Sequence, residues 1–200
     1  AMHMRAFVPY NAKNPWHRIA CRISEYNFQT KLNKTYMLGR DCRYADFLGL
    51  NYYARTATSG LGDGTLPHVP VNDLGWEIYP DGLPQVAEKL EKLLKRPIWV
   101  TENGTCDNQD SFRARYIYEH LKSMLRSGLP FERYYHWCFC DNFEWLEGES
   151  ARFGLINVDY ATQTRTIKRS GEFYADMIRN GGVTDEAYDA YVRGEVYRIE

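Results

Sequence analysis

Apolar positions along this chain follow two different periods, and these periods predict alternating strands and helices. Short apolar runs bounded by Pro, Gly or Asn predict four strands, at residues 4–10, 45–53, 98–102 and 134–139. Apolar positions three or four residues apart predict four helices, at residues 15–38, 81–95, 109–127 and 170–179. Because strands and helices alternate, we expect parallel strands joined by crossover helices, an α/β fold.

Each of the first three predicted helices has one apolar side, which we expect to face the sheet. Pro15 suits the first turn of the first helix, and Gly39 is expected to end it. The expected inner faces are Ile19, Ile23, Tyr26, Phe28 and Leu32 in the first helix; Leu83, Val86, Leu90, Leu93 and Leu94 in the second; and Tyr116, Ile117, His120, Leu121, Met124 and Leu125 in the third.

Four strand–helix units are half of an eight-fold (β/α) barrel, and a complete barrel needs ~250 residues. The chain has 200 residues, and we expect residues 1–200 to form one domain. A long Gly/Pro-rich loop is expected at residues 58–79, since loops of that length often carry function. We expect a short hairpin at residues 151–160. We also expect residues 184–200 to form an extension with a short added helix.

The stretch from Ile98 to Gly104 is the strongest candidate for chemistry. An apolar strand ends in Glu102, and Asn103-Gly104 predicts a turn away from the sheet. Chemistry in parallel α/β folds is found at the carboxyl ends of strands. A surface Glu that merely opens a loop is the alternative interpretation.

Composition excludes several other classes of function. The net charge of −1 gives no basic surface for nucleic acid. The five Cys include no CxxC pair and the His residues are scattered, so neither a zinc site nor another cofactor is indicated. No apolar run approaches the ~20 residues of a membrane span. Reduced thiols in a cytoplasmic protein are the simplest explanation of the odd number of Cys.

Four motifs together resemble the family 1 glycoside hydrolases, the β-glucosidases, β-galactosidases and their relatives. They are Leu48-Gly49-Leu50-Asn51-Tyr52-Tyr53, Thr101-Glu102-Asn103-Gly104, Asp141-Asn142-Phe143-Glu144-Trp145, and Arg152-Phe153-Gly154-Leu155 with Val158-Asp159-Tyr160. The resemblance covers residues 45–181. It implies a (β/α)8 TIM-barrel fold and hydrolysis of β-glycosides with retention at the anomeric carbon.

The resemblance also implies roles for particular residues. Glu102 would be the catalytic nucleophile, and Tyr53 would donate a hydrogen bond to it, which favours an ionised carboxylate. The implied sugar contacts are Asn51 beside the nucleophile, Trp137 under the sugar ring, and Glu144 with Trp145 at the distal hydroxyls. Relatives that cleave 6-phosphosugars usually have small hydroxylated residues in place of this last pair. An acidic side chain there would repel phosphate, so we expect an unphosphorylated sugar.

One part of the family pattern is missing. The second catalytic carboxylate of the family lies in an Asn-Glu-Pro motif, and no Asn-Glu-Pro occurs in this sequence. We therefore expect the chain to supply the last four β/α units, strands five to eight, and to pair with a missing N-terminal half-barrel or with a copy of itself. Two alternatives stay open: a non-catalytic carbohydrate-binding or assembly module, and a different (β/α) enzyme that uses Glu102 and Glu144 as its carboxylate pair.

Overall fold

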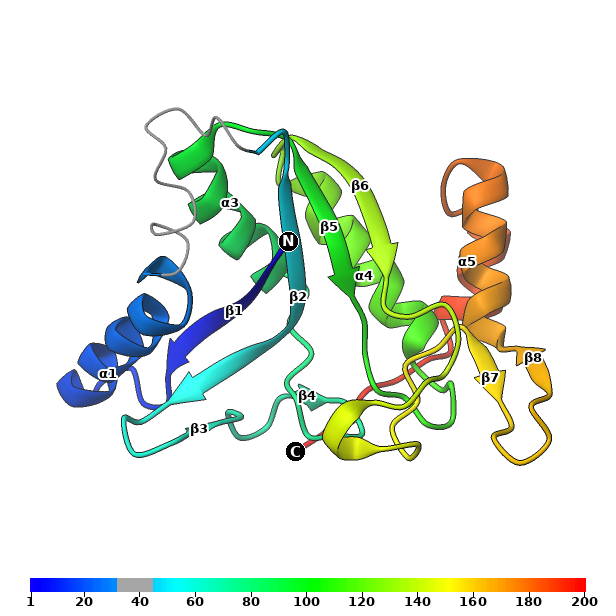
Figure 1. Ribbon diagram of the computed structural model, residues 1–200, viewed down its shortest axis with the longest axis horizontal. Coiled ribbons are helices and arrows are strands. Elements are labelled where there is room, and N and C mark those ends of the chain that lie inside the picture. Colours follow the sequence, from blue (N-terminus) through cyan, green and yellow to red (C-terminus); the bar gives the residue numbers. More distant parts are fainter. Residues whose placement is uncertain (32–44) are drawn as a thin grey trace.

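The computed structural model describes residues 1–31 and 45–200. Its main sheet has four parallel strands in the order β1 (Met2–Pro9), β2 (Leu48–Thr58), β5 (Ile98–Asn103) and β6 (Phe131–His136). The two-residue strand β3 (Asp63–Gly64) pairs antiparallel with the end of β2. Neighbours in the sheet follow chain order (Figure 1). The predicted alternation of parallel strands and crossover helices is thus confirmed.

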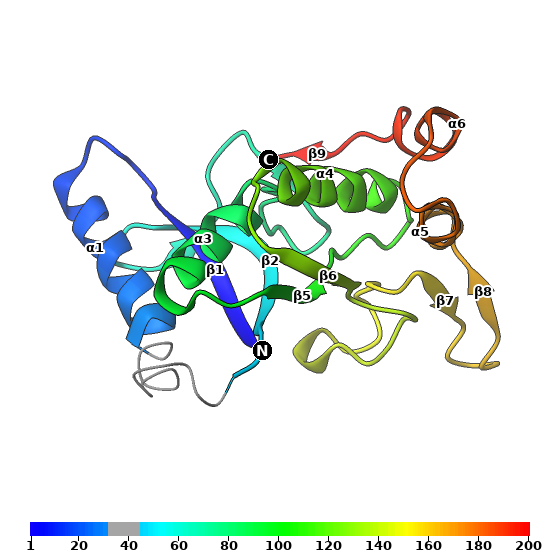
Figure 2. The ribbon, with the colours of Figure 1, turned by 90° about the horizontal axis from the view of Figure 1, so that it is seen from above.

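Helices cover one side of this sheet. They are α1 (Pro15–Glu25), which continues into a π-helical turn at Tyr26–Thr30, α3 (Gly82–Leu94), α4 (Arg113–Arg126) and α5 (Arg169–Asn180). Figure 2 shows them along one side of the strands, from α1 at one end to α5 at the other. Within the described residues, the edge strands β1 and β6 each have one neighbour in the main sheet.

The main core lies between the sheet and helices α3 and α4. Leu83, Val86 and Leu90 of α3 are fully buried in one cluster with strand residues such as Leu50 and Val100. These three side chains confirm their part of the predicted inner face, and the side chains of Leu93 and Leu94 lie outside the described residues. A second core joins α4 to α5 around Tyr116, Ile117 and Phe173.

The predicted apolar faces were wrong at two places. Leu125 was expected in the core, but it is 75% exposed near the end of α4. Ile19 and Ile23 of α1 and Tyr26 of the π-helical turn were expected to face the sheet, yet each is about half exposed. The buried residues of α1 are instead Ala20 and Cys21, small side chains that fit close to the strands. The rest of the predicted first helix, with Leu32 and Gly39, lies outside the described residues.

The remaining elements surround the carboxyl edge of the sheet. Strand β2 runs to Thr58, beyond the predicted end at residue 53, while β6 ends at His136 and leaves Trp137 just beyond it. A short 3-10 turn, Trp145–Glu147, precedes the hairpin of β7 (Ile156–Val158) and β8 (Arg165–Ile167).

The last residues form the short helix predicted for the extension and then a strand. This helix is α6 (Asp185–Ala187), which continues into a π-helical turn at Tyr188–Val192. Strand β9 (Arg198–Ile199) then pairs with β4 (Pro70–Val71) of the long loop. No helix in the described part of the chain is long and apolar enough to cross a membrane.

Candidate active site

Glu102 and Tyr53 meet at the carboxyl edge of the sheet, although 49 residues separate them. The parallel register of β2 and β5 sets Asn51 opposite Glu102, so residues inside β2 lie beside the end of β5. The Tyr53 hydroxyl donates a hydrogen bond of 2.6 Å to Oε2 of Glu102. Burial is the main cause, and this hydrogen bond the second, that raises the pKa of Tyr53 well above its usual range. Tyr53 therefore keeps its proton and stays a donor to the carboxylate.

Asn51 is held at the same edge by a side chain of the neighbouring strand. The hydroxyl of Thr101 donates to Oδ1 of Asn51 at 2.6 Å. Both residues are partly buried; Asn51 lies two positions before Tyr53 on β2, and Thr101 lies one position before Glu102 on β5. This bond restricts the Asn51 amide beside Glu102, where the sequence prediction put it.

The Asn103-Gly104 pair does not act as the turn that its sequence predicted. Asn103 is still part of β5 and is fully buried. Its Nδ2 donates to the carbonyl of Tyr52 at 2.7 Å and to the hydroxyl of Tyr116 at 2.9 Å, and its Oδ1 accepts from Tyr134 at 2.8 Å. The amide therefore joins β2, β5, β6 and α4 directly behind Glu102.

Gly104 is required by close packing. A Cβ at this position would lie 1.9 Å from the carbonyl oxygen of Trp137, which is far inside van der Waals contact. The amide of Trp137 also donates to the carbonyl of Asn103 at 2.9 Å. The segment after β5 and the segment after β6 therefore run in direct contact, which brings Trp137 next to the Glu102 strand.

Trp137 and Glu144 form the next part of the site. Nε1 of Trp137 lies 3.4 Å from Oε2 of Glu144 and donates to it. Burial raises the pKa of Glu144, the nearby charge of Glu102 adds to the rise, and the Trp137 hydrogen bond opposes it. Two carboxylates and one indole face are thus gathered on one edge of the sheet.

Trp145 is placed differently from the other predicted residues. It is 80% exposed in the 3-10 turn, and the neighbouring Leu146 is fully exposed. Of the six predicted site residues, Asn51, Tyr53, Glu102, Trp137 and Glu144 are brought together by bonds or strand register, whereas Trp145 projects into solvent.

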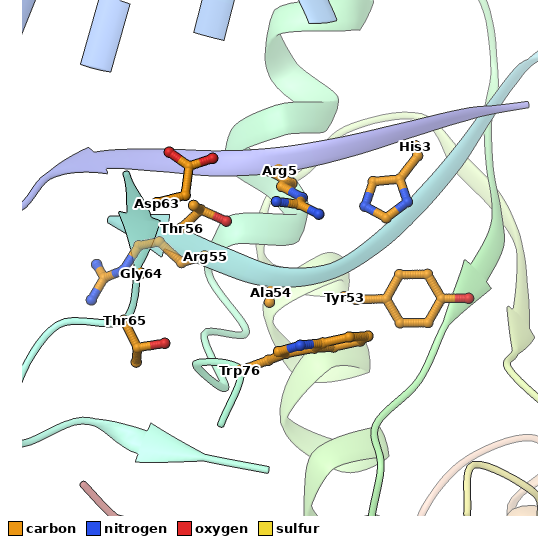
Figure 3. Close-up of a pocket in the computed structure, with 10 residues that line it drawn as sticks. All are labelled: His3, Arg5, Tyr53, Ala54, Arg55, Thr56, Asp63, Gly64, Thr65 and Trp76. Atoms are coloured by element: carbon orange, nitrogen blue, oxygen red, sulfur yellow. The ribbon is translucent and has the colours of Figure 1, made fainter. Parts of the chain in front are cut away.

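A cavity of about 190 Å3 opens beside Tyr53. Figure 3 shows His3, Tyr53 and Trp76 around the same opening, with the Tyr53 hydroxyl pointing away from the other lining residues. The ring of His3 stacks on Tyr53 at 5.7 Å, and that of Trp76 meets it edge-on at 6.3 Å. The volume is below the roughly 300–1,000 Å3 of complete ligand sites.

His3 and Trp76 were missed by the sequence analysis. The long loop showed no readable specificity, but a Trp inside a Gly/Pro-rich loop was a usable signal, because Trp in a wet loop often contacts a ligand. His3 had no comparable signal in its strand.

No metal centre is indicated in residues 1–31 and 45–200, where no group of three or more His, Cys, Asp or Glu side chains is arranged to hold an ion. Cys21, Cys106, Cys138 and Cys140 are free thiols. Burial raises the pKa of Cys106 to about 11 and that of Cys138 to about 12, which makes both thiols unreactive at neutral pH.

Comparison with known proteins shows what this chain is similar to. The family model for glycosyl hydrolase family 1 matches residues 29–183. A beta-galactosidase of Saccharolobus solfataricus is 36% identical over 160 residues, which is 70% of this chain and 33% of that protein. A beta-glucosidase of Agrobacterium sp. is 39% identical over 162 residues, 70% of this chain and 35% of that protein.

A solved structure is similar over almost the whole chain. The beta-glycosidase from Pyrococcus horikoshii matches with a TM-score of 0.83 and 27% identity, over 94% of this chain and 49% of that one. The chain thus spans about a third of the length of these curated relatives and about half of the solved chain. The solved structures that it resembles are TIM-barrel glycosidases with a sheet of parallel strands, like the main sheet here. The match to the family model and these similarities show that the chain belongs to glycosyl hydrolase family 1.

Proposed function

We propose that this chain is the C-terminal half of a retaining β-glycosidase, supplying barrel strands five to eight, with Glu102 as the nucleophile. The observation that carries the proposal is the 2.6 Å hydrogen bond from Tyr53 to Glu102 at the carboxyl edge of the sheet. A hydrogen bond donated to a carboxylate favours its charged form and fixes its orientation. One oxygen of Glu102 is then held by Tyr53, and the other is available for attack.

The reaction would proceed in two displacements. Glu102 attacks the anomeric carbon and forms a glycosyl ester, while the bond to the leaving-group oxygen breaks and an acid protonates that oxygen. Water, deprotonated by the same acid/base residue, then attacks the anomeric carbon and releases Glu102. A retaining enzyme needs this second carboxyl about 5–5.5 Å from the nucleophile, and we assign it to an N-terminal half-barrel.

The substrate we propose is an unphosphorylated β-glucoside or β-galactoside. Trp137 offers a flat apolar face to the C–H side of a pyranose, and Glu144 can accept hydrogen bonds from sugar hydroxyls. Two negative carboxyls, Glu102 and Glu144, disfavour a phosphate group at this edge. The names of the relatives, beta-glucosidase and beta-galactosidase, agree with this class.

The partner we propose is the N-terminal half-barrel. Helix α1 and the π-helical turn after it present a stripe of large apolar side chains, each about half exposed: Trp16, Ile19, Ile23 and Tyr26. Strands β1 and β6 are edges of the main sheet in the described part of the chain. Paired edges and a covered apolar face are what barrel closure supplies. Association of two copies of this chain is the competing arrangement.

The test is the intact mass of the chain after incubation with a 2-fluoro β-glucoside that carries an activated leaving group. Such a reagent needs little acid assistance, so it reports on the nucleophile without the second carboxylate. We expect a stable sugar adduct on Glu102, either in the chain alone or after addition of an N-terminal half-barrel of a family 1 enzyme. Glu102→Gln is the matched control and should stay unlabelled.

A non-catalytic carbohydrate-binding or assembly module is the second candidate function. The absence of Asn-Glu-Pro from the sequence favours it. Failure to form the adduct both with and without the N-terminal half-barrel, in a chain that is folded, would decide for this module.

A further inference from the structure

The last residues of the chain are attached to the loop that forms one wall of the cavity. Strand β9 pairs antiparallel with β4, with Ile199 opposite Pro70 and Arg198 opposite Val71. Two backbone hydrogen bonds extend the pairing: the amide of Val69 donates to Glu200 at 3.0 Å, and the amide of Glu200 donates to Val69 at 3.1 Å. The loop between β2 and α3 is therefore held by a segment from the far end of the sequence.

Asn72 connects this pairing to Trp76. Its backbone carbonyl accepts from the guanidinium of Arg198 at 3.1 Å. Its side-chain Oδ1 accepts from the amides of Leu74 at 3.0 Å and Trp76 at 2.9 Å, and its own amide donates to the Trp76 carbonyl at 3.0 Å. Asn72 is buried. The backbone of Trp76 is thus fixed on both sides by a residue that Arg198 binds.

The other end of the tail is anchored to the helices. Glu195 is buried, and its two carboxyl oxygens accept from the Arg115 amide at 2.7 Å, in the first turn of α4, and from Arg169 at 2.9 Å. Burial raises the pKa of Glu195 to about 7; Asp107 and Asp110 add to the rise, and the Arg115 amide and Arg169 oppose it.

Tyr197 adds a second anchor beside Glu195. Its hydroxyl donates to Glu119 at 2.9 Å, and the guanidinium of Arg115 lies 4.9 Å from the centre of its ring. Residues 195–200 therefore join α4 and α5 to the loop, and we call them the strap.

The strap reaches the candidate site through aromatic contacts. Trp76 packs edge-on against Tyr53 at 6.3 Å and lies 6.0 Å from the ring of Phe153. Tyr53 in turn binds Glu102. We infer that the strap positions Trp76 against Tyr53 and so shapes the wall beside Glu102, with Arg198 as a positioning residue that touches no substrate. The effect of the strap on the reaction rests on the proposed function, whereas its effect on the position of Trp76 does not.

The first experiment follows Trp76 without using activity. The chain is labelled with 5-fluorotryptophan, and the Trp76 resonance is assigned with Trp76→Phe. We expect Arg198→Ala to shift or broaden this resonance and to speed amide hydrogen exchange in residues 69–78 about 2- to 10-fold, the effect of one lost hydrogen bond. Arg198→Lys should restore part of the wild-type behaviour.

Arg193→Ala is the matched control, because Arg193 lies in the same tail but pairs with the exposed Asp189 and not with the loop. It should leave the Trp76 signal unchanged. Unaltered resonances of the other four Trp residues show that each variant is folded. A Trp76 resonance and exchange rates that are the same in Arg198→Ala and wild type would overturn the inference.

The second experiment measures the rate of adduct formation with the 2-fluoro β-glucoside. Arg198→Ala should weaken reagent binding about 2- to 10-fold and change the maximal rate less than twofold, since the strap acts on a wall and not on the reacting atoms. A moved Trp76 with unchanged adduct kinetics would overturn the positioning role. If the wild type forms no adduct either with or without an N-terminal half-barrel, the proposed function fails, and the fluorine signal still decides whether the strap places Trp76.

Discussion

Replacing Tyr53 by Phe removes one hydroxyl and leaves the ring that packs against His3 and Trp76. The lost contact is the 2.6 Å hydrogen bond to Glu102. Hydrogen bonds to charged groups contribute about 1.5–3 kcal/mol. If this amount is lost in the attacking state, where the carboxylate must be ionised and correctly oriented, the rate falls about 10- to 150-fold. The assay is the increase of the adduct mass with time under the 2-fluoro β-glucoside.

Tyr52→Phe is the control for this prediction. Tyr52 is adjacent in sequence but points to the other side of the strand, where its hydroxyl donates to the carbonyl of Tyr79 at 2.8 Å. We expect it to lose about 1 kcal/mol of folding free energy and to form the adduct at nearly the wild-type rate. Adduct formation by Tyr53→Phe within twofold of wild type, or equal slowing in both variants, would refute the role given to this hydrogen bond.

Three further predictions test packing, pH dependence and association. Gly104→Ala should lower the free energy of unfolding by at least about 1–3 kcal/mol, because its Cβ would collide with the Trp137 carbonyl. Gly62→Ala is the control and should leave that free energy unchanged, because its Cβ would lie in open space. Equal melting temperatures for the two variants would contradict this prediction. The raised pKa of Glu195 means that the folded state holds its proton more tightly than the unfolded state does. The stability that this proton adds to the fold is complete below about pH 4.5 and is lost as the pH rises to about 7. Over that window the free energy of unfolding of the wild type, measured by denaturant titration, should therefore fall by up to about 3 kcal/mol relative to that of Glu195→Gln. Parallel plots of unfolding free energy against pH for the two proteins would contradict this. Ile23→Ser, on the exposed stripe of α1, should weaken binding of an N-terminal half-barrel about tenfold or more without unfolding the chain; unchanged affinity in sedimentation would exclude that face.

Several elements could be predicted from the sequence because they depend on local patterns. The apolar spacing of Leu83, Val86 and Leu90 is that of one helix face, and all three are buried against the sheet. The strand ending at Glu102 was found because an apolar run can satisfy a buried strand without knowledge of its neighbours. The ends of β2 and β6 were less accurate, because pairing partners decide where a strand stops.

Other features were misjudged because one residue type serves two purposes. Asn-Gly is a common turn signal, but Asn103 here joins four elements and Gly104 makes room for the Trp137 carbonyl. The stripe on α1 has helical spacing, yet Ile19 and Ile23 are half exposed in the described chain. Spacing shows that a face is apolar, but only the surrounding structure shows what covers it.

The sequence by itself determined the alternation of strands and helices and the place of Glu102 near the end of its strand, since both follow from residue order and apolar period. Pairing between strands decided that Tyr53 lies inside β2 and that Trp137 lies just beyond β6. Only the tertiary structure decided that β2 and β5 pair in the register that brings the Tyr53 hydroxyl to Glu102. It also decided that residues 195–200 hold the loop carrying Trp76. These contacts join residues far apart in the chain, and they form because buried polar groups need partners, a requirement that local sequence does not reveal.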